Sequence, residues 1–412
     1  MSDWLDGRPL VIERGEGNYL VDSEGARYFD GVSSLWVNLH GHDHPLMRQR
    51  LNEQLERIAH STLLGLAAVP PTELAEKLVE LAPPGLTRVF FSDNGSTAME
   101  VALKIAFQHW QQSGQTRRTR FVSFEQAYHG DTLGAVSVGG IDAFHAPFRP
   151  LCFEALWASN TDIRSLERIL EEHGDEVAAV CIEPLVQAAG GMLTFPSGWL
   201  ARVRELCDES GALLIADEVA TGFGRTGTFF ACEHENVTPD LLAIAKSLTA
   251  GYLPLGATLA REEIFESFLA PSGSGRHFSH GHSYTGNALA CAAALANLEI
   301  FEREDVLARV RLSSDHLRGR LAELERHASV GEIRQVGLIA GVDLVRDRRG
   351  RVPFDPAERV GHWVCNALRH HGVILRPLGD TVVIMPPLSS TTVELDHLVD
   401  SLSRCIVEVT GG

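Results

Sequence analysis

Short, unbroken runs of apolar residues recur through the middle of this chain, and helical patterns separate most of them. The runs cover residues 88–91, 120–124, 177–182, 212–216, 241–245 and 255–260, and the helical patterns cover residues 98–111, 162–173, 198–210 and 288–303. Apolar runs without polar alternation are typical of strands that are buried on both faces. The sequence therefore predicts an α/β fold whose large domain is a mostly parallel sheet covered by helices.

The two ends of the chain have a different pattern. Residues 18–21 and 26–29 flank a turn and predict a hairpin, and helices are expected at 45–58 and 72–81. Further on, helices are predicted at 306–326 and 356–371, and short strands at 333–336, 339–344, 373–376 and 382–385. Thr391 and Glu394 form a capping box that begins a last helix. We expect a smaller α+β domain of residues 1–33 and 304–412, and a large domain of residues 34–303.

Charge and composition exclude several classes of protein. The 412 residues hold 36 Lys and Arg against 54 Asp and Glu, a net charge of −18, whereas binding to a phosphate backbone needs clustered positive charge. No apolar run reaches the ~18 residues of a membrane helix, and residues 1–6 lack the order of a signal peptide. Seven scattered cysteines without a C-x-x-C motif fit a reduced compartment. We therefore expect a cytoplasmic protein that binds neither nucleic acid nor membrane.

Lysine is rare enough in this chain for each one to be weighed. Only Lys77, Lys104 and Lys246 occur, so arginine supplies the other 33 positive charges. Lys77 lies on the polar face of a helical pattern near Glu80, and Lys104 has Glu100 four residues before it. Because such spacings pair opposite charges on a helix surface, Lys77 and Lys104 are predicted to be solvated surface residues.

Lys246 differs because it directly follows the apolar run 241–245. A lysine at the end of a buried strand loses hydration, and this loss lowers its pKa towards nucleophilic use. The run 212–216 leads in the same way into Asp217, at the edge of the sheet where open α/β folds bind ligands. Taken singly, each residue has a plainer interpretation: a lysine whose ammonium reaches the surface, and an aspartate that caps a strand.

A third segment predicts an anion site. Residues 90–97 read Phe-Phe-Ser-Asp-Asn-Gly-Ser-Thr, a strand that passes into a helix whose free backbone N–H groups and dipole attract phosphate. Taken alone, the segment is as readily an ordinary N-cap. Together, Lys246, Asp217 at the end of its strand, and the anion site of residues 90–97, here called the phosphate cup, are the parts of a pyridoxal phosphate (PLP) site. Neither the dinucleotide motif G-x-G-x-x-G nor the P-loop motif occurs.

The motifs around these residues resemble those of the class III, fold-type I aminotransferases. Residues 214–227, which include Asp-Glu-Val-Ala-Thr-Gly-Phe-Gly, and residues 245–251, Ala-Lys-Ser-Leu-Thr-Ala-Gly, carry the resemblance, which covers nearly the whole chain. Residues 33–42, 60–62, 128–132 and 281–287 are most similar to the branch that converts 8-amino-7-oxononanoate to 7,8-diaminononanoate (7,8-diaminopelargonic acid, DAPA) in biotin biosynthesis. The resemblance implies a PLP-dependent transaminase that uses L-lysine or S-adenosylmethionine as amino donor, and a homodimer with shared active sites.

The resemblance implies a cofactor role for five residues. Lys246 is expected to form the Schiff base with PLP and to move the proton between substrate and cofactor. Asp217 is expected to pair with the pyridine nitrogen, Tyr128 to stack on the ring, and Gly95 with Ser96 to bind the phosphate. Tyr128 has a plainer interpretation as a core aromatic residue.

Five further residues are implied in cofactor or substrate binding. Ser283 and His282 are expected to reach the phosphate from the other subunit, and Trp36 and Gly281 to line the substrate pocket. Arg376 is expected to bind the carboxylate of the oxo acid, which suits a guanidinium fork better than an ammonium group. As plainer interpretations, Trp36 is a packing residue and Arg376 is one of many arginines.

Two features depart from the pattern of the family. Leu35-Trp36 and His282-Ser283 stand where the adenosylmethionine-using members carry paired tryptophans and Pro-Thr, so the sequence is closer to the lysine-using branch. The family also has an upstream segment with aromatic residues that covers the substrate. This chain begins past that segment, which implies either a late start or a more open pocket.

Three other functions stay open at the level of sequence. An ω-aminotransferase would act on diamines, β-alanine or 4-aminobutyrate, and an aminomutase would keep both half-reactions on one substrate. A regulator with a PLP fold but no activity is disfavoured, because it has no need of Lys246, Asp217 and Tyr128 together.

Closely spaced histidines raise a metal hypothesis. The two groups are His40, His42 and His44, and His277, His280 and His282. No cysteine or carboxylate joins either group at the spacing of metal ligands, so the sequence predicts no metal site.

Overall fold

A computed structural model describes residues 9–411 of the chain, so residues 1–6, on which the signal-peptide prediction rests, lie outside the described part. Internal contacts divide the chain into two compact units, one of residues 49–308 and one that joins the residues up to 48 with those from 309 onward. No helix in the described part of the chain has the length and apolar character to cross a lipid bilayer.

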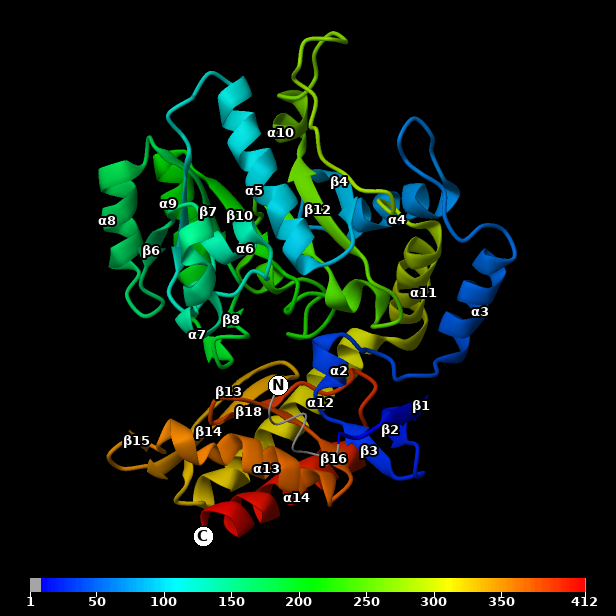
Figure 1. Cartoon of the computed structure of the whole chain (residues 1–412), viewed down its shortest axis with the longest axis vertical. Coiled ribbons are helices and arrows are strands. Elements are labelled where there is room, and N and C mark those ends of the chain that lie inside the picture. The colour runs from blue at the N-terminus through cyan, green and yellow to red at the C-terminus, as the bar shows by residue number, and fades with distance from the viewer. Residues whose placement is uncertain (1–8, 412) are drawn as a thin grey trace. The chain divides into compact units, whose positions relative to one another are not determined.

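The larger unit contains the predicted sheet of buried strands (Figure 1). Its seven strands, in spatial order, are β4 (Leu86–Ser92), β12 (Gly256–Arg261), β11 (Leu241–Ile244), β10 (Leu213–Asp217), β7 (Val177–Ile182), β5 (Arg120–Phe124) and β6 (Leu156–Ala158). The pairs from β11 to β6 are parallel, whereas β12 is antiparallel to both β11 and β4. All six apolar runs are strands, and only the three-residue β6 was not predicted.

Helices cover this sheet because successive strand residues point to opposite faces and both faces are apolar. Helix α5 (Gly95–Gln112) packs its buried face, including Val101 and Ile105, on strand residues such as Ala179, Cys181 and Ile215. The other helices of this unit are α3 (Pro45–Leu55), whose first four residues cluster with the smaller unit, α4 (Val69–Leu81), α6 (Leu133–Ser137), α7 (Asp142–His145), α8 (Arg164–His173), α9 (Trp199–Ser210), α10 (Glu262–Glu266) and α11 (Ala288–Glu304). Short elements complete the unit: the pair β8 (Val186–Gln187) and β9 (Leu193–Thr194), and the 3₁₀ turns Ala146–Leu151, Ala231–Glu235 and Lys246–Thr249.

The described residues of the smaller unit form two sheets from both ends of the chain. One has the order β1 (Ile12–Glu16), β2 (Tyr19–Asp22), β3 (Arg27–Asp30) and β16 (Val373–Ile374), and it includes the predicted hairpin β2–β3. The other has the order β13 (Val330–Val336), β14 (Ile339–Asp347), β18 (Thr381–Ile384) and β17 (Arg376–Leu378), with β15 (Val352–Pro353) beside β14. Because β16 pairs with β3, the N-terminal hairpin and the C-terminal region form one structure.

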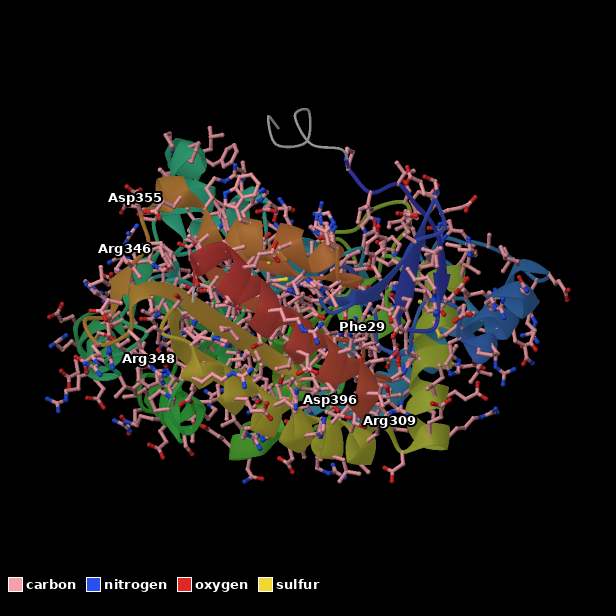
Figure 2. All side chains as sticks on the ribbon, turned by 90° about the horizontal axis from the view of Figure 1, so that it is seen from below. Phe29, Arg309, Arg346, Arg348, Asp355 and Asp396 are labelled. Carbon is pink, nitrogen blue, oxygen red and sulfur yellow. The ribbon has the colours of Figure 1, made fainter. Side chains whose placement is uncertain are left out.

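In the described part of the smaller unit, the helices are α2 (Ser33–Trp36), α12 (Val306–Ala322), α13 (Val360–Arg369) and α14 (Thr392–Thr410), with 3₁₀ turns at Glu323–Arg326 and Pro356–Glu358. The predicted capping box at Thr391 and Glu394 is present, with the Thr391 N–H 2.8 Å from Oε2 of Glu394. Figure 2 labels Asp396 on α14, which accepts a hydrogen bond from Nε2 of His316 on α12 at 2.8 Å. Helix α13 starts four residues later than predicted, because Arg359 adopts a left-handed backbone with φ +51°.

Residues 34–48 cluster with the smaller unit, whereas the predicted domain boundary lies at 33/34. Hydrogen bonds hold this segment there. The Ser389 N–H donates to the carbonyl oxygen of Leu39 at 3.1 Å, and Nε2 of His42 lies 3.0 Å from Oδ2 of Asp30. Such pairings between residues far apart in sequence are not encoded by any local pattern.

Candidate functional site

Asp217 and Lys246 lie at the carboxyl ends of neighbouring parallel strands. β10 ends at Asp217, which is in register with Ala243 of β11, and β11 ends two residues before Lys246. Asp217 is only 4% exposed, and Lys246 is half-buried. The structure therefore brings together the two groups that the sequence predicted from separate apolar runs, at the sheet edge where open α/β folds bind ligands.

The backbone at Lys246 is strained. Its φ is +40°, in the left-handed region that costs a side-chain-bearing residue free energy and that clusters at functional sites. Asn297 on α11 is fully buried and holds the turn that follows, with Nδ2 donating to the carbonyl oxygens of Ser247 and Leu248 at 3.0 Å each. This support fixes the direction in which the lysine leaves the strand.

The surroundings of Lys246 favour its neutral amine. Burial lowers the pKa of Lys246; the negative charges of Asp217 and Glu183 oppose this effect, while the positive charge of Arg225 adds to it. The net pKa stays below the ordinary value. At a given pH, a larger fraction of the amine is then neutral and free to act as a nucleophile or as a general base.

The segment from Tyr128 to Asp131 connects three parts of the site. The Tyr128 N–H donates to Oε1 of Glu183 at 3.0 Å, and the Tyr128 hydroxyl donates to Oδ2 of Asp131 at 2.8 Å. The Tyr128 ring stacks on His145, with centroids 5.8 Å apart and an interplanar angle of 11°. The backbone and the hydroxyl of Tyr128 are therefore both held, which keeps the ring in a fixed plane.

The predicted phosphate cup is the N-terminus of α5. Asn94 caps this helix by accepting from the Thr97 N–H at 3.0 Å, and Gly95 and Ser96 form its first turn. The Asp131 N–H donates to Oγ of Ser96 at 3.1 Å. A Cβ atom at Gly95 would lie 2.7 Å from Cγ1 of Val219, so a larger residue would force Val219 in the loop after β10 to shift.

These residues fit PLP on their own chemistry. Lys246 offers an amine to the aldehyde, Asp217 a buried carboxylate to the pyridine nitrogen, and the first turn of α5 unpaired N–H groups to the phosphate. Tyr128 offers an aromatic plane that is held at both ends. All of them belong to the larger unit.

Gly281, His282 and Ser283 lie on an exposed loop of the larger unit. Gly281 has φ +152°, a conformation that glycine adopts most easily. Nδ1 of His282 lies 3.4 Å from Oδ2 of Asp93, and the carbonyl oxygen of Ser283 accepts from Nε2 of His60 at 2.8 Å. The Ser283 hydroxyl makes no hydrogen bond within the described chain and stays available for a ligand.

Trp36 and Arg376 belong to the smaller unit. Trp36 is 5% exposed and ends a turn in which Ser33, Ser34, Leu35 and Trp36 all have φ between +48° and +72°. The guanidinium of Arg376 forms no hydrogen bond or ion pair with any described residue, and Arg376 lines a cavity of about 320 Å³ together with Arg369 and Leu35. An unpaired guanidinium in a cavity is suited to bind a carboxylate.

The other two lysines are paired on the surface. Nζ of Lys77 lies 3.1 Å from Oε2 of Glu80, as predicted. The predicted pair of Lys104 with Glu100 is wrong, because Nζ of Lys104 lies 3.0 Å from Nδ1 of His280 and Glu100 accepts from the Gly134 N–H at 2.6 Å.

Sequence reasoning missed two buried residues of this site, His129 and Glu183. Nδ1 of His129 lies 2.7 Å from Oδ2 of Asp217, and Glu183 anchors Tyr128. Glu183 directly follows β7, as Lys246 follows the run that forms β11, so the rule of polar residues at strand ends could have found it. His129 carries no such signal, because only the fold brings it next to Asp217.

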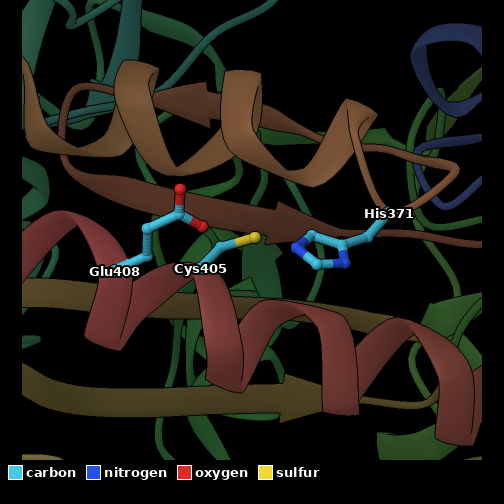
Figure 3. A group of neighbouring side chains, drawn as sticks. All are labelled: His371, Cys405 and Glu408. Atoms are coloured by element: carbon cyan, nitrogen blue, oxygen red, sulfur yellow. The ribbon is translucent and has the colours of Figure 1, made fainter.

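The histidine groups have separate partners. Nε2 of His42 lies 3.0 Å from Oδ2 of Asp30, and the rings of His40 and His44 pack edge to face with centroids 5.9 Å apart. Among the described residues, the one trio of candidate metal ligands is His371, Cys405 and Glu408 of the smaller unit, whose ligand atoms lie within 4.8 Å of one another (Figure 3). Burial raises the pKa of the Cys405 thiol to about 11, which disfavours the thiolate form that binds a metal.

Comparisons with known proteins give one consistent result. The family model described as "Aminotransferase class-III" matches residues 2–406. Proteins named adenosylmethionine-8-amino-7-oxononanoate aminotransferase from Geobacter sulfurreducens and Nitratidesulfovibrio vulgaris are each 51% identical over 100% of this chain, which spans 95% and 79% of their lengths.

Solved structures of such proteins share the fold. The crystal structure of adenosylmethionine-8-amino-7-oxononanoate aminotransferase from Methanocaldococcus jannaschii matches with a TM-score of 0.97 and 40% identity, covering 99% of this chain and 95% of that one. An amine transaminase from an uncultivated Pseudomonas species in a PLP-bound form has a TM-score of 0.94 and 38% identity, covering 98% of this chain and 96% of that one.

Proposed function

Because this chain belongs to the class-III aminotransferases, which are PLP-dependent enzymes, we propose that it transfers an amino group to 8-amino-7-oxononanoate and forms 7,8-diaminononanoate in biotin biosynthesis. The observation that carries this proposal is the 51% identity, over the whole chain, to proteins named for that reaction. The family also implies small-molecule substrates, an amino donor and an oxo-acid acceptor.

The site residues then have the following roles. PLP, when bound, withdraws electrons from the substrate carbon that loses or gains a proton. Nζ of Lys246 would hold the cofactor and would move that proton, a task that suits an amine of lowered pKa. The carboxylate of Asp217 keeps the pyridine nitrogen protonated, Tyr128 covers one face of the ring, and the first turn of α5 at Gly95 and Ser96 binds the phosphate.

The enzyme is proposed to act as a cytoplasmic homodimer. The exposed loop of Gly281, His282 and Ser283 supports shared active sites, because its polar groups lie at the surface, where a second subunit can use them. Tyr284, at the end of this loop, leaves 60% of its surface exposed, which is large for an aromatic residue outside an interface.

The amino donor is S-adenosylmethionine or L-lysine. The names of the relatives support adenosylmethionine, whereas Leu35-Trp36 and His282-Ser283 resemble the lysine-using branch. Both donors present a primary amine beside a carboxylate, so the chemistry at Lys246 does not distinguish them.

A turnover assay tests the reaction and the donor together. The PLP-loaded protein is incubated with 8-amino-7-oxononanoate and either S-adenosylmethionine, L-lysine or 4-aminobutyrate, and 7,8-diaminononanoate is measured by mass spectrometry. We expect product with one of the first two donors. Product with 4-aminobutyrate alone would instead indicate an ω-aminotransferase. Isomerisation of 8-amino-7-oxononanoate at unchanged mass, without any added donor, would indicate an aminomutase.

Arg376→Ala is expected to raise the KM for 8-amino-7-oxononanoate by about 10- to 100-fold, because a charge-assisted hydrogen bond to the carboxylate is lost. The kcat should change much less, since the carboxylate is far from the reacting carbon of this long substrate. Arg369→Ala removes the other guanidinium of the same cavity and serves as the matched control. If Arg369→Ala raises the KM and Arg376→Ala does not, the carboxylate site belongs to Arg369.

A further inference from the structure

Two buried ionisable side chains beside the proposed cofactor site have no role in the assignment above. His129 is 2% exposed and Glu183 is 5% exposed. Both act electrostatically on the site, because the pKa of His129 responds to Asp217 and the pKa of Lys246 responds to Glu183. Burying an ionisable group costs free energy of folding unless the group is paired. The partners of these two side chains therefore indicate what they do in the site.

His129 fixes the carboxylate of Asp217. Nδ1 of His129 lies 2.7 Å from Oδ2 of Asp217, and the Val219 N–H donates to Oδ1 of the same carboxylate at 3.0 Å. Both oxygens are therefore held, and the carboxylate plane cannot rotate freely. Burial lowers the pKa of His129, but the hydrogen bond and the charge of Asp217 outweigh it and raise the pKa overall, which keeps a proton on Nδ1 for this bond.

Glu183 fixes the backbone segment from which His129 projects. Its Oε1 accepts from the Tyr128 N–H and its Oε2 from the Ala188 N–H, both at 3.0 Å. Tyr128 and His129 are consecutive, so one anchor sets the position of both side chains. Two residues further on, the Asp131 N–H binds Oγ of Ser96 at the start of α5. This single segment thus reaches the ring face, the Asp217 carboxylate and the phosphate cup.

Gly130 makes the close approach of this segment to α5 feasible. It has φ +121°, and a Cβ atom there would lie only 2.1 Å from Oγ of Ser96. The segment is therefore held at three residues: Tyr128 by Glu183, His129 by Asp217, and Asp131 by Ser96.

We propose that His129 and Glu183 are positioning residues for the PLP ring: His129 aims the carboxylate of Asp217 at the pyridine nitrogen, and Glu183 holds the segment that carries both His129 and Tyr128. This inference rests on the proposed placement of PLP between Asp217 and Tyr128. His129 acts on one ring atom only, whereas Glu183 acts on the whole ring, and this difference separates the two roles in experiment.

The role of His129 is tested with PLP and with an analogue that has a carbon atom in place of the pyridine nitrogen. Binding is measured by equilibrium dialysis in the Lys246→Ala background, so that only non-covalent affinity is compared. His129→Leu removes the donor, and His129→Asn keeps an amide N–H near the position of Nδ1. We expect His129→Leu to weaken PLP binding about tenfold, to leave binding of the analogue within about twofold, and His129→Asn to restore most of the affinity for PLP.

Each outcome of that experiment decides something. Equal losses for PLP and the analogue would show that His129 only fills space, and no loss for either would remove it from the site. If the Lys246→Ala protein with all other residues unchanged binds neither compound, the proposed PLP site itself is wrong. That result would contradict the proposed function, and not only the role of His129.

The role of Glu183 is tested against a matched buried glutamate. Glu218 is also fully buried and accepts backbone N–H groups with both oxygens, from Ala231 at 2.9 Å and Cys232 at 2.8 Å, but it anchors a different segment. Glu183→Gln is expected to weaken the binding of PLP and of the analogue about five- to tenfold each, and to change the visible circular dichroism of the bound cofactor, which reports on the orientation of the ring.

Glu218→Gln should leave the dichroism unchanged, although it should lower Tm about as much as Glu183→Gln does, because each removes a buried acceptor of backbone N–H groups. If Glu218→Gln alters the dichroism as much as Glu183→Gln does, the effect is one of general destabilisation. If Glu183→Gln leaves the affinity and the dichroism unaltered, Glu183 is not a positioning residue.

Discussion

Replacing Lys246 with alanine is expected to abolish turnover, by about 10⁴-fold or more, and to leave the cofactor bound only non-covalently. The general acid–base step alone accounts for about 10²–10⁴-fold, and the covalent hold on the cofactor is lost as well. No other amine can take over within the larger unit, because Lys77 and Lys104 are engaged at the surface with Glu80 and His280.

Because the chain has only three lysines, a label on any one of them can be assigned without ambiguity. Mass spectrometry after borohydride reduction should find the cofactor on Lys246 in the unaltered protein and on no residue in Lys246→Ala. Lys77→Ala and Lys104→Ala are the matched controls. Both should keep turnover within about twofold, because the ion pair of Lys77 and the contact of Lys104 with His280 are at the surface, where such contacts contribute little. Substantial turnover by Lys246→Ala, or reduction that labels Lys104, would refute the assignment of the catalytic lysine.

The second large effect is expected for Asp217→Asn, which should lower kcat/KM by about 10²–10³-fold, the range for removing one preorganised electrostatic contact. The amide has nearly the shape of the carboxylate but no charge, so the pyridine nitrogen loses the group that favours its protonated form. His129 can keep its bond to this side chain by changing its tautomer. The expected loss is therefore electrostatic, and the affinity for PLP should fall while that for the carbon-substituted analogue should not.

Asp240→Asn is the matched control for that substitution. Asp240 is also buried, but it precedes β11 and binds Arg204 at 2.7 Å and the Leu214 N–H at 2.7 Å, at the opposite end of the strands. Its replacement should lower Tm, because a buried ion pair loses one partner, and should leave cofactor affinity within about twofold. If both variants lose PLP affinity to the same degree, the loss in Asp217→Asn reports on folding and not on the pyridine nitrogen.

The core of the fold was predictable because strands buried on both faces leave a strong local signal. The runs that end at Asp217 and before Lys246 are both strands of one sheet, and parallel strands place their carboxyl ends at one edge. The proximity of Lys246 and Asp217 could therefore be predicted from two local patterns. The capping box at Thr391 was equally local, since donor and acceptor are three residues apart.

What could not be predicted depends on contacts between residues distant in sequence. The left-handed turn of residues 33–36 is held by the Ser33 hydroxyl, which donates to the carbonyl oxygen of Met385 at 2.7 Å, and by Asp30, which accepts from the Ser34 N–H at 2.9 Å. No preference of Ser-Ser-Leu-Trp favours positive φ. Lys104 likewise takes its partner from a loop 176 residues away.

The central claim is that this aminotransferase exchanges amino groups with 7,8-diaminononanoate, and the reverse half-reaction tests it most directly. The PLP-loaded protein is mixed with 7,8-diaminononanoate alone, without any acceptor, and the visible absorbance of the bound aldehyde form of the cofactor is followed, with 4-aminobutyrate as the parallel control. We expect 7,8-diaminononanoate to bleach this absorbance within the time of a few turnovers and to yield 8-amino-7-oxononanoate, and 4-aminobutyrate to leave the absorbance unchanged. Bleaching by 4-aminobutyrate with none by 7,8-diaminononanoate would contradict it.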